Sequence, residues 1–201
     1  MNASKLSVAE DHYPGSEPHG TDPMNLINDL HHKVYVATAV QAQKRVGFVV
    51  TWVTPASLNA KEPRILMVVS KFNHSLATLR ETKKCILNLL SEDQVREFFI
   101  FGSRHSDEVD KFSGIRTEQN QYGLRLLDAV GSAEVEIETM FETPDRWIFY
   151  GKVQGDSMGP GTALTLGTAL AALSSEEKSV LDIKMGADVS RDEKQFTPGP
   201  S

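Results

Sequence analysis

The sequence has a single cysteine, Cys85, among its 201 residues, which excludes an internal disulfide framework. Such frameworks are typical of secreted domains, so we expect a protein of the reducing cytoplasm. No apolar run approaches the roughly 20 residues that cross a bilayer. Residues 1–24 are polar and lack the apolar segment of a signal peptide. We therefore expect no membrane insertion.

Positive charge is also scarce, with 21 Lys and Arg against 27 Asp and Glu, a net charge of −6. Nucleic acids and anionic membranes bind positive surfaces, so we expect neither as a partner. Any phosphate that the protein binds must occupy a locally positive pocket. The hydrophobic content of 40% is that of an ordinary globular domain, and the length suffices for one substantial core.

Signatures of several common enzyme classes are missing. There is no phosphate loop ending in Gly-Lys-Ser/Thr, no Gly-x-Gly-x-x-Gly after a strand and no Gly-x-Ser-x-Gly elbow. The adjacent His31 and His32 would point about 100° apart on a helix and could not chelate one ion together. We predict no metal site, and we expect Cys85, in mid-strand, to pack as a small hydrophobic residue.

Short apolar segments bounded by turn residues predict strands. The predicted strands are residues 34–40, one that begins at residue 47 and that Pro55 ends, 65–69, 85–90, 131–141 and 146–153. The predicted helices are residues 24–32, 73–82, one that begins at residue 91, 163–173 and 174–183. Because these elements do not alternate as βαβ units do, we predict a mainly β fold, an antiparallel barrel with peripheral helices.

We expect a single domain at residues 23–185. A flexible arm, residues 1–22, precedes it, and a flexible tail, residues 186–201, follows it. Two capping boxes, at residues 91–94 and 174–177, mark helix starts inside the domain. Residues 154–162 read as a glycine-rich loop.

Residues 47–58 are the most informative stretch for function. The stretch begins as an apolar strand and ends among small side chains, with Thr51, Thr54, Ala56 and Ser57. Such an end exposes several N–H and O–H donors that no bulky group blocks, which suits an acceptor-rich planar ligand carrying a phosphate. These residues alone leave open the alternative of a buried strand with an ordinary turn.

Four segments together resemble the flavin reductase-like family, whose fold is the FMN-binding split barrel. They follow one another in the family's order at residues 47–57, 63–71, 86–92 and 110–115. The first, Gly-Phe-Val-Val-Thr-Trp-Val-Thr-Pro-Ala-Ser, is most similar to the flavin reductase-like module of diflavin flavoproteins. The likeness covers residues 30–155.

The resemblance implies an antiparallel split β-barrel that forms a homodimer, with FMN near the interface. It also implies which residues contact the cofactor. These are Thr51, Trp52 and Val53 along the ring; Thr54, Ala56, Ser57, Ser70, Lys71 and Asn73 at the ribityl chain and phosphate; Asn88, Leu89 and Leu90 at the pyrimidine edge; and Lys111 and Phe112 on a neighbouring loop.

Lys71 is the residue that we expect to neutralise the phosphate. It follows a buried strand and precedes the helix that Asn73 is expected to cap, where free N–H groups add to the positive field. For each of three residues the sequence leaves a structural alternative open. Lys71 could be a solvated lysine at a strand end, Trp52 a core residue, and Lys111 a surface charge beside a core aromatic.

The function implied by the resemblance is an FMN-binding oxidoreductase that passes electrons from NAD(P)H to flavin or to a downstream acceptor. Hydride transfer is the chemistry of the two cofactors, so no catalytic side chain is required. The family's reductases carry a histidine-containing segment after the last barrel strands, whereas residues 163–184 contain no histidine. This difference leaves open a non-enzymatic flavin-binding electron-transfer module reduced by a partner protein. A split barrel that binds haem, or no ligand, is a third possibility.

Overall fold

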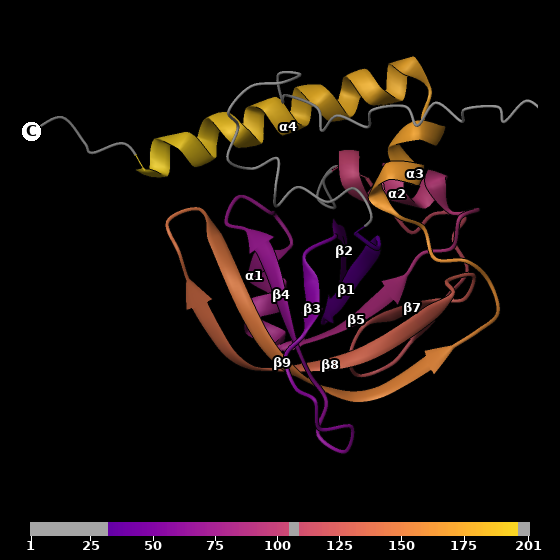
Figure 1. Ribbon diagram of the computed structural model, residues 1–201, viewed down its shortest axis with the longest axis vertical. Helices are drawn as coiled ribbons and strands as arrows, with labels where there is room; N and C mark the ends of the chain where they lie inside the picture. The colour runs from indigo at the N-terminus through magenta and orange to yellow at the C-terminus, as the bar shows by residue number, and fades with distance from the viewer. Residues whose placement is uncertain (1–31, 105–108, 197–201) are drawn as a thin grey trace, which may run out of the picture.

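Seven strands form one antiparallel sheet that curls into a half-barrel in the computed structural model, which describes residues 32–104 and 109–196 (Figure 1). The strand order is β2-β1-β5-β8-β9-β4-β3. The strands are β1 Tyr35–Gln41, β2 Lys44–Val50, β3 Val53–Pro55, β4 Arg64–Ser70, β5 Lys84–Leu89, β8 Gly131–Glu142 and β9 Arg146–Met158. The predicted mainly β, antiparallel fold is confirmed. The predicted arm and nearly all of the predicted first helix lie outside the described residues.

The two edge strands, β2 and β3, are consecutive in the sequence. Only Thr51 and Trp52 separate them, so the predicted continuous strand is interrupted there. The Val53 N–H donates to the Thr51 carbonyl at 3.0 Å, and the Val68 N–H donates to the Trp52 carbonyl at 3.0 Å. The chain can pass from one edge to the other in two residues because the curl brings β2 against β4.

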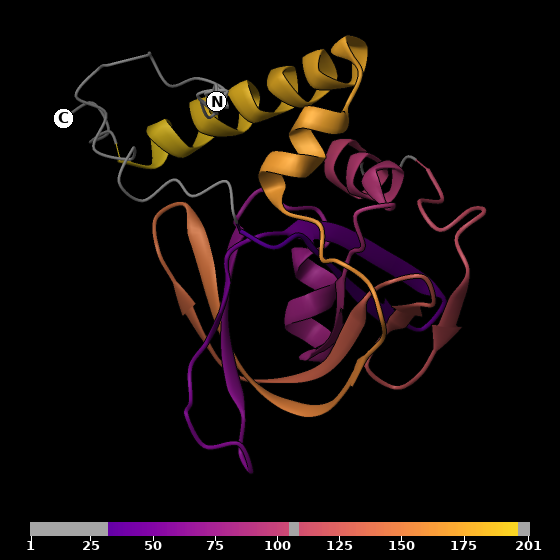
Figure 2. The same ribbon diagram turned by 45° about the vertical axis from the view of Figure 1, so that its right-hand side comes forward.

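The concave side of the sheet encloses helix α1, Leu76–Thr82, as Figure 2 shows. Leu79 packs there against Met67 and Phe149 in a cluster that also holds Val135 and Ile137. These last two residues alternate with glutamates along β8, so the predicted strand with one wet face is confirmed. Asn73 does not cap α1 directly, because its side chain accepts from the Ser75 N–H, at 2.9 Å, one residue before the helix.

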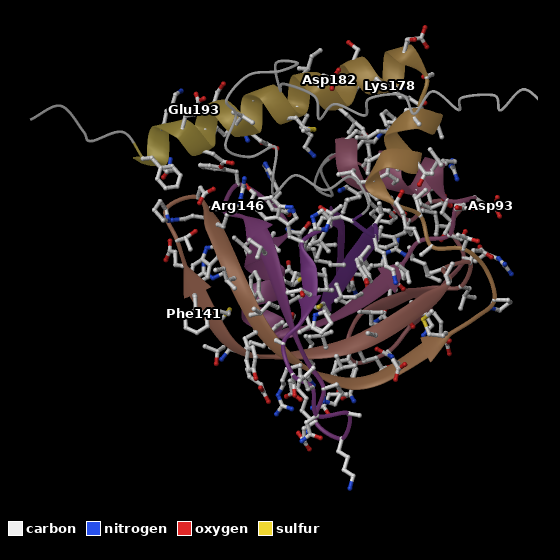
Figure 3. The ribbon with its side chains drawn as sticks, viewed as in Figure 1. Asp93, Phe141, Arg146, Lys178, Asp182 and Glu193 are labelled. Carbon is white, nitrogen blue, oxygen red and sulfur yellow. The ribbon has the colours of Figure 1, made fainter. Side chains whose placement is uncertain are left out.

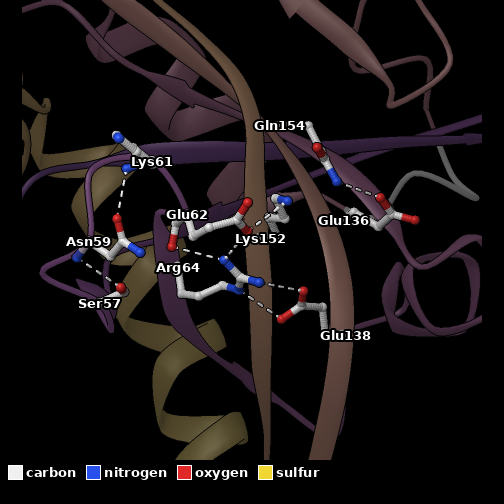
Figure 4. A network of polar contacts seen from close by, with 9 residues as sticks. All are labelled: Ser57, Asn59, Lys61, Glu62, Arg64, Glu136, Glu138, Lys152 and Gln154. Atoms are coloured by element: carbon white, nitrogen blue, oxygen red, sulfur yellow. Dashed lines mark hydrogen bonds and ion pairs between the residues drawn. The ribbon is translucent and has the colours of Figure 1, made fainter.

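On the outer face, charged side chains tie β4, β8 and β9 together (Figure 4). Arg64 donates to both carboxylate oxygens of Glu138, at 2.9 and 3.0 Å, and Glu62 pairs with Lys152 at 2.8 Å. The hydrogen bond from Lys152, and then that from Arg64, lowers the pKa of Glu62. Since these pairs are solvent-exposed, they fix register more than they stabilise the fold.

A second layer of helices lies across one end of the half-barrel: α2 Val95–Ser103, α3 Leu166–Ala172 and α4 Ser175–Phe196. The capping box before α4 is confirmed. The Ser174 hydroxyl accepts from the Glu177 N–H, and the Glu177 carboxylate accepts from the Ser174 N–H. Before α2 only one half of the predicted box forms, from the Ser91 N–H to Gln94.

Three sequence-based expectations need correction. The tail predicted at residues 186–201 is helical as far as Phe196, because the helix-ending prolines lie beyond it and Arg146 anchors its last turns through Asp192. The loop predicted at residues 154–162 belongs to β9 as far as Met158. The short hairpin of β6 Thr117–Gln119 and β7 Leu124–Leu126 was not predicted at all.

Gly47 on β2 sets how closely α2 can approach the sheet. A Cβ there would lie 2.6 Å from a ring carbon of Phe101 and 3.0 Å from one of Phe112. Both rings are buried and pack edge to face, with centroids 5.2 Å apart. The contact thus joins α2, β2 and the segment after α2 around one small residue.

We predict that Gly47→Ala destabilises the protein by about 1–3 kcal/mol, because two buried rings must shift. Gly186→Ala is the matched control, since no atom lies within 4 Å of a Cβ at that helical position. It should stabilise α4 by up to about 1 kcal/mol. Urea unfolding monitored by circular dichroism measures both, and equal effects would show that the rings have room to move.

Candidate functional site

A pocket of about 300 Å³ opens where the end of the half-barrel meets the second helical layer. Its floor comes from residues 48–52, at the β2–β3 junction, and from residues 68–70, at the end of β4. Its sides come from residues 72–75 and from α2. Its cover comes from α4, through Leu181, Lys184, Met185 and Asp188. Such a volume is at the lower end of that found for ligand sites.

The pocket combines an apolar wall with a polar rim. The apolar side chains include Val49, Phe98, Phe101, Leu166 and Leu170. The polar side chains include Thr51, Ser70, Asn73, His74 and Ser75. The charged residues of the lining are Asp188 and four cationic residues, Arg104, Lys111, Arg146 and Lys184. A flat aromatic ligand with polar edges and a negative charge fits this set of groups.

Arg146 is held in place from several sides, and Figure 3 shows it between the sheet and α4. Its guanidinium pairs with Asp145 at 3.3 Å and with Asp192 of α4 at 2.6 Å. It also lies over the Trp52 ring, 5.6 Å from the centroid. Trp52 is 41% exposed, so the predicted alternative of a core tryptophan is wrong.

Lys111 is buried, with 5% of its surface exposed. Its ammonium donates to the carbonyl of Gly47 at 2.9 Å and to that of Phe101 at 3.3 Å. It therefore brings a positive charge to the bottom of the pocket, next to the apolar wall. The alternative of a solvated surface lysine is excluded by this burial.

Five of the residues predicted to contact the cofactor line the pocket: Thr51, Trp52, Ser70, Asn73 and Lys111. They come from three segments of the sequence, the β2–β3 junction, the end of β4 and the region after α2. The curl of the sheet and the packing of α2 bring them together. This convergence is the main agreement between the sequence and the structure at the site.

Four predicted residues lie along β3 and the loop after it, beside the pocket but not in its lining: Val53, Thr54, Ala56 and Ser57. Val53 packs against the core of the half-barrel. The Ala56 N–H donates to the Arg64 carbonyl at 2.7 Å. The Ser57 hydroxyl accepts from the Asn59 N–H at 3.0 Å, as Figure 4 shows.

Lys71, the predicted phosphate partner, does not line the pocket. Its ammonium pairs with Glu142 at 2.6 Å and donates to the Thr143 carbonyl at 3.4 Å, both on the β8–β9 hairpin. The cation that reaches the pocket from this hairpin is Arg146 instead. Nothing in the sequence around Arg146 distinguishes it from a surface arginine, so the sequence analysis missed it.

Asn88, Leu89, Leu90 and Phe112 are buried in the protein interior, away from the pocket lining. The Asn88 amide donates to the carbonyls of Val36 and Leu124, each at 3.1 Å, and accepts from the Leu126 N–H at 2.8 Å. Because β7 covers this strand end, these residues connect the small hairpin to the sheet.

Cys85 is fully buried in β5, and burial raises the pKa of its thiol to about 12, so it has no nucleophilic character at neutral pH. Within residues 32–104 and 109–196, no group of His, Cys, Asp and Glu side chains is arranged to hold a metal ion. No helix in that part of the chain has the length and apolarity needed to cross a membrane.

The family model described as "Flavin reductase like domain" matches residues 27–166, more than half of the chain. The chain belongs to the flavin reductase-like family. The matched region contains the floor and most of the sides of the pocket. The match ends before α4, so the cover of the pocket lies outside it.

Two curated proteins are similar to this chain in sequence. Diflavin flavoprotein A 1 of Synechocystis is 26% identical over 147 residues, 72% of this chain but 25% of its own length. The reductase subunit HsaB of a flavin-dependent monooxygenase from Rhodococcus jostii is 26% identical over 121 residues, 60% of each chain. This chain thus spans a quarter of the diflavin flavoprotein.

Solved structures share the fold. Nitrilotriacetate monooxygenase component B from Mycobacterium thermoresistibile superposes with a TM-score of 0.59 and 25% identity, covering 65% of this chain and 71% of that one. The NADH:FAD oxidoreductase SgcE6 of Streptomyces globisporus gives a TM-score of 0.63 at 20% identity, covering 76% and 92%. The split-barrel fold predicted from the sequence is confirmed.

We predict that Asn88→Ala destabilises this flavin reductase-like protein by about 3 kcal/mol, because it leaves buried backbone groups without partners. Asn120→Ala is the control, since Asn120 is exposed and its side chain also makes two hydrogen bonds. Its effect should stay below about 1 kcal/mol. Denaturant unfolding compares the two, and a stable Asn88→Ala protein would refute the connecting role.

Proposed function

We propose that this protein binds FMN and passes electrons from NAD(P)H to flavin or to a downstream acceptor. The observation that carries the proposal is the pocket, in which five residues expected from the family's pattern meet an apolar wall and several cations. Family membership supports flavin as the cofactor. The diflavin flavoprotein relatives favour FMN, and the relative named NADH:FAD oxidoreductase supports nicotinamide as the reductant.

The residues of the pocket fit a flavin. Phe98, Phe101 and Leu170 offer an apolar surface for a flat ring, and Thr51 with Ser70 offers hydroxyl groups for its polar edges. Arg146 supplies a planar, permanently charged group for a phosphate. When bound, the flavin accepts and donates hydride and single electrons, which protein side chains cannot do.

The protein's own contribution is binding, orientation and electrostatics. Lys111 brings a cationic side chain to a fixed and buried position, where charge stabilisation is stronger than in water. The apolar side chains of α2 and α3 form a low-polarity wall on one side of the pocket. No acid–base pair is needed for hydride transfer, because the transfer is the chemistry of the two cofactors.

We also propose that the protein is a homodimer in the cytoplasm, with the flavin near the interface. The family resemblance and the single cysteine support these points. Exposed large apolar side chains at the β2–β3 junction and on the loop after β3, Trp52 at 41% and Leu58 at 105%, suit a partner surface. Light scattering of the purified protein measures the assembly directly.

The decisive experiment is an absorbance spectrum of the purified protein before and after FMN is added, followed by NADH and NADPH with excess FMN. Flavin bands and steady nicotinamide oxidation at catalytic protein concentrations support the reductase. Flavin bands without oxidation favour an electron-transfer module reduced by another protein, to which the match with one quarter of the diflavin flavoprotein also points. A protein that takes up no FMN refutes both.

Tryptophan fluorescence localises the cofactor. We predict that FMN quenches the emission of the wild-type protein and of Trp147→Phe, in which the pocket residue Trp52 remains. The quenching should fall by more than about twofold in Trp52→Phe, since the contact between the indole and the flavin ring is lost. Trp147 is the matched control because it lies on β9, outside the pocket lining. Equal quenching in both variants would place the flavin elsewhere.

A further inference from the structure

Helix α4 covers the pocket and adds little to the buried core of the described residues. Of its 22 residues only Leu181 is buried. The Lys184 ammonium donates to the Gly102 carbonyl at the end of α2. Towards the C-terminus, contacts with the described half-barrel include the Arg146–Asp192 pair and Arg191 over the Phe72 ring, at 5.8 Å. Because α4 buries only Leu181 among the described residues, the helix can move without disturbing the core of the half-barrel.

The Asp192 carboxylate is only partly satisfied in its place. Its side chain is 14% exposed, and one oxygen lies 2.6 Å from the Arg146 guanidinium. The other oxygen is buried and has no hydrogen-bond partner in the described part of the chain. Burial raises the pKa of Asp192, against the opposing effect of Arg146. A buried oxygen without a partner marks a contact that a better-matched anion can replace.

A phosphate in the pocket would lie beside one carboxylate of α4 and would compete with a second one. Asp188 lines the pocket, and Asp192 takes the guanidinium that a phosphate would need. Repulsion from these groups opposes a dianion as long as α4 keeps this position. The volume of about 300 Å³ is also small for a ring system that carries a ribityl phosphate.

We propose that Arg146 is the anion-binding group of the pocket and that Asp192 is its internal counter-ion, which a phosphate-bearing ligand displaces, so that α4 is released. With the flavin phosphate as that ligand, the inference rests on the proposed function. Asp145 and the Trp52 ring keep the guanidinium oriented when Asp192 leaves, and its planar fork matches phosphate oxygens in pairs.

Paired titrations of FMN and riboflavin test the anion subsite, because the two ligands differ only in the phosphate. Followed by flavin fluorescence, Asp192→Asn should bind FMN about tenfold more tightly than the wild type, a difference of about 1.4 kcal/mol. Its affinity for riboflavin should change by less than about twofold. Asp182→Asn is the matched control, because it removes the same charge from an exposed position of the same helix. It should change neither affinity.

Arg146→Gln should lower the affinity for FMN by at least about tenfold and leave riboflavin binding within about twofold. The same FMN and riboflavin affinities in Asp192→Asn and wild type would overturn the counter-ion role. If Arg146→Gln lowers the affinity for riboflavin as much as the affinity for FMN, Arg146 does not bind the phosphate. Thermal unfolding of each variant shows that it is folded.

Amide hydrogen exchange in α4 tests the release without any measure of activity. Protection of residues 188–196 should fall when FMN is added, but not when riboflavin is added, and it should already be low in Asp192→Asn. Inorganic phosphate at high concentration should reproduce the fall if a free anion suffices. The experiment with inorganic phosphate tests the release of α4 even if the protein binds no flavin. In that case only the proposed function is refuted. Unchanged protection with both FMN and phosphate would overturn the release of α4.

Discussion

The bend of the β8–β9 hairpin is the constraint on which the rest of the structure depends. The register between the two long strands shifts twice, between Glu134 and Val135 and between Ile137 and Thr139. Such irregularities increase the local twist and bend the strands. As a result β2 and β4, which are far apart in the strand order, come into contact and enclose α1. A flat sheet of the same strands would leave this apolar face exposed.

The pocket is a direct consequence of this curl. Thr51 and Trp52 connect the two edges of the sheet, where the Trp52 carbonyl accepts from the Val68 N–H of β4 and the Thr51 carbonyl accepts from the Val53 N–H. Helix α2 approaches β2 closely over Gly47 and supplies Phe101 to the same region. Backbone polar groups and an apolar wall therefore meet at one place, which is the combination that a flat polar-edged ligand requires.

The charge around the pocket differs in sign from the net charge of the protein. The protein carries a net charge of −6, yet four cationic residues reach the pocket. Those on the outer face of the sheet, such as Arg64 and Lys152, are neutralised by glutamates next to them. Arg146 is also paired, with its neighbour Asp145 and with Asp192 on α4. The strength of the anion site thus depends on the position of α4.

Much of the sheet could be predicted because its strands alternate or are continuously apolar. The strands around Val36, Met67, Ile86, Val135 and Phe149 all lie within or beside predicted segments. The hairpin of β6 and β7 could not be predicted, because three residues are too few for a periodic pattern and its anchor, Asn88, lies far away in the sequence. Helix α4 was cut short in the prediction because Gly186 and the terminal prolines are typical of chain ends.

The site was predictable only where the family's pattern follows the chain. Thr51, Trp52, Ser70, Asn73 and Lys111 could be named because they lie in, or directly beside, segments with that pattern, whereas Arg146 and α4 do not. Lys71 and Arg146 show why the sequence did not identify the cation that lines the pocket at this hairpin. Both follow or begin a strand beside the same hairpin, and only the local path of the chain decides that Lys71 reaches Glu142 while Arg146 turns towards the pocket.

The family match includes the floor of the pocket and its wall of α2, but not its cover, α4. Residues 27–166 account for the half-barrel, the β2–β3 junction and the wall of α2, while α4 lies beyond them. The part that covers the pocket is therefore carried by a segment outside the common domain. A helix added to a shared fold can change how a ligand enters the pocket. It can do so because it alters the cover of the pocket without altering the strands beneath it.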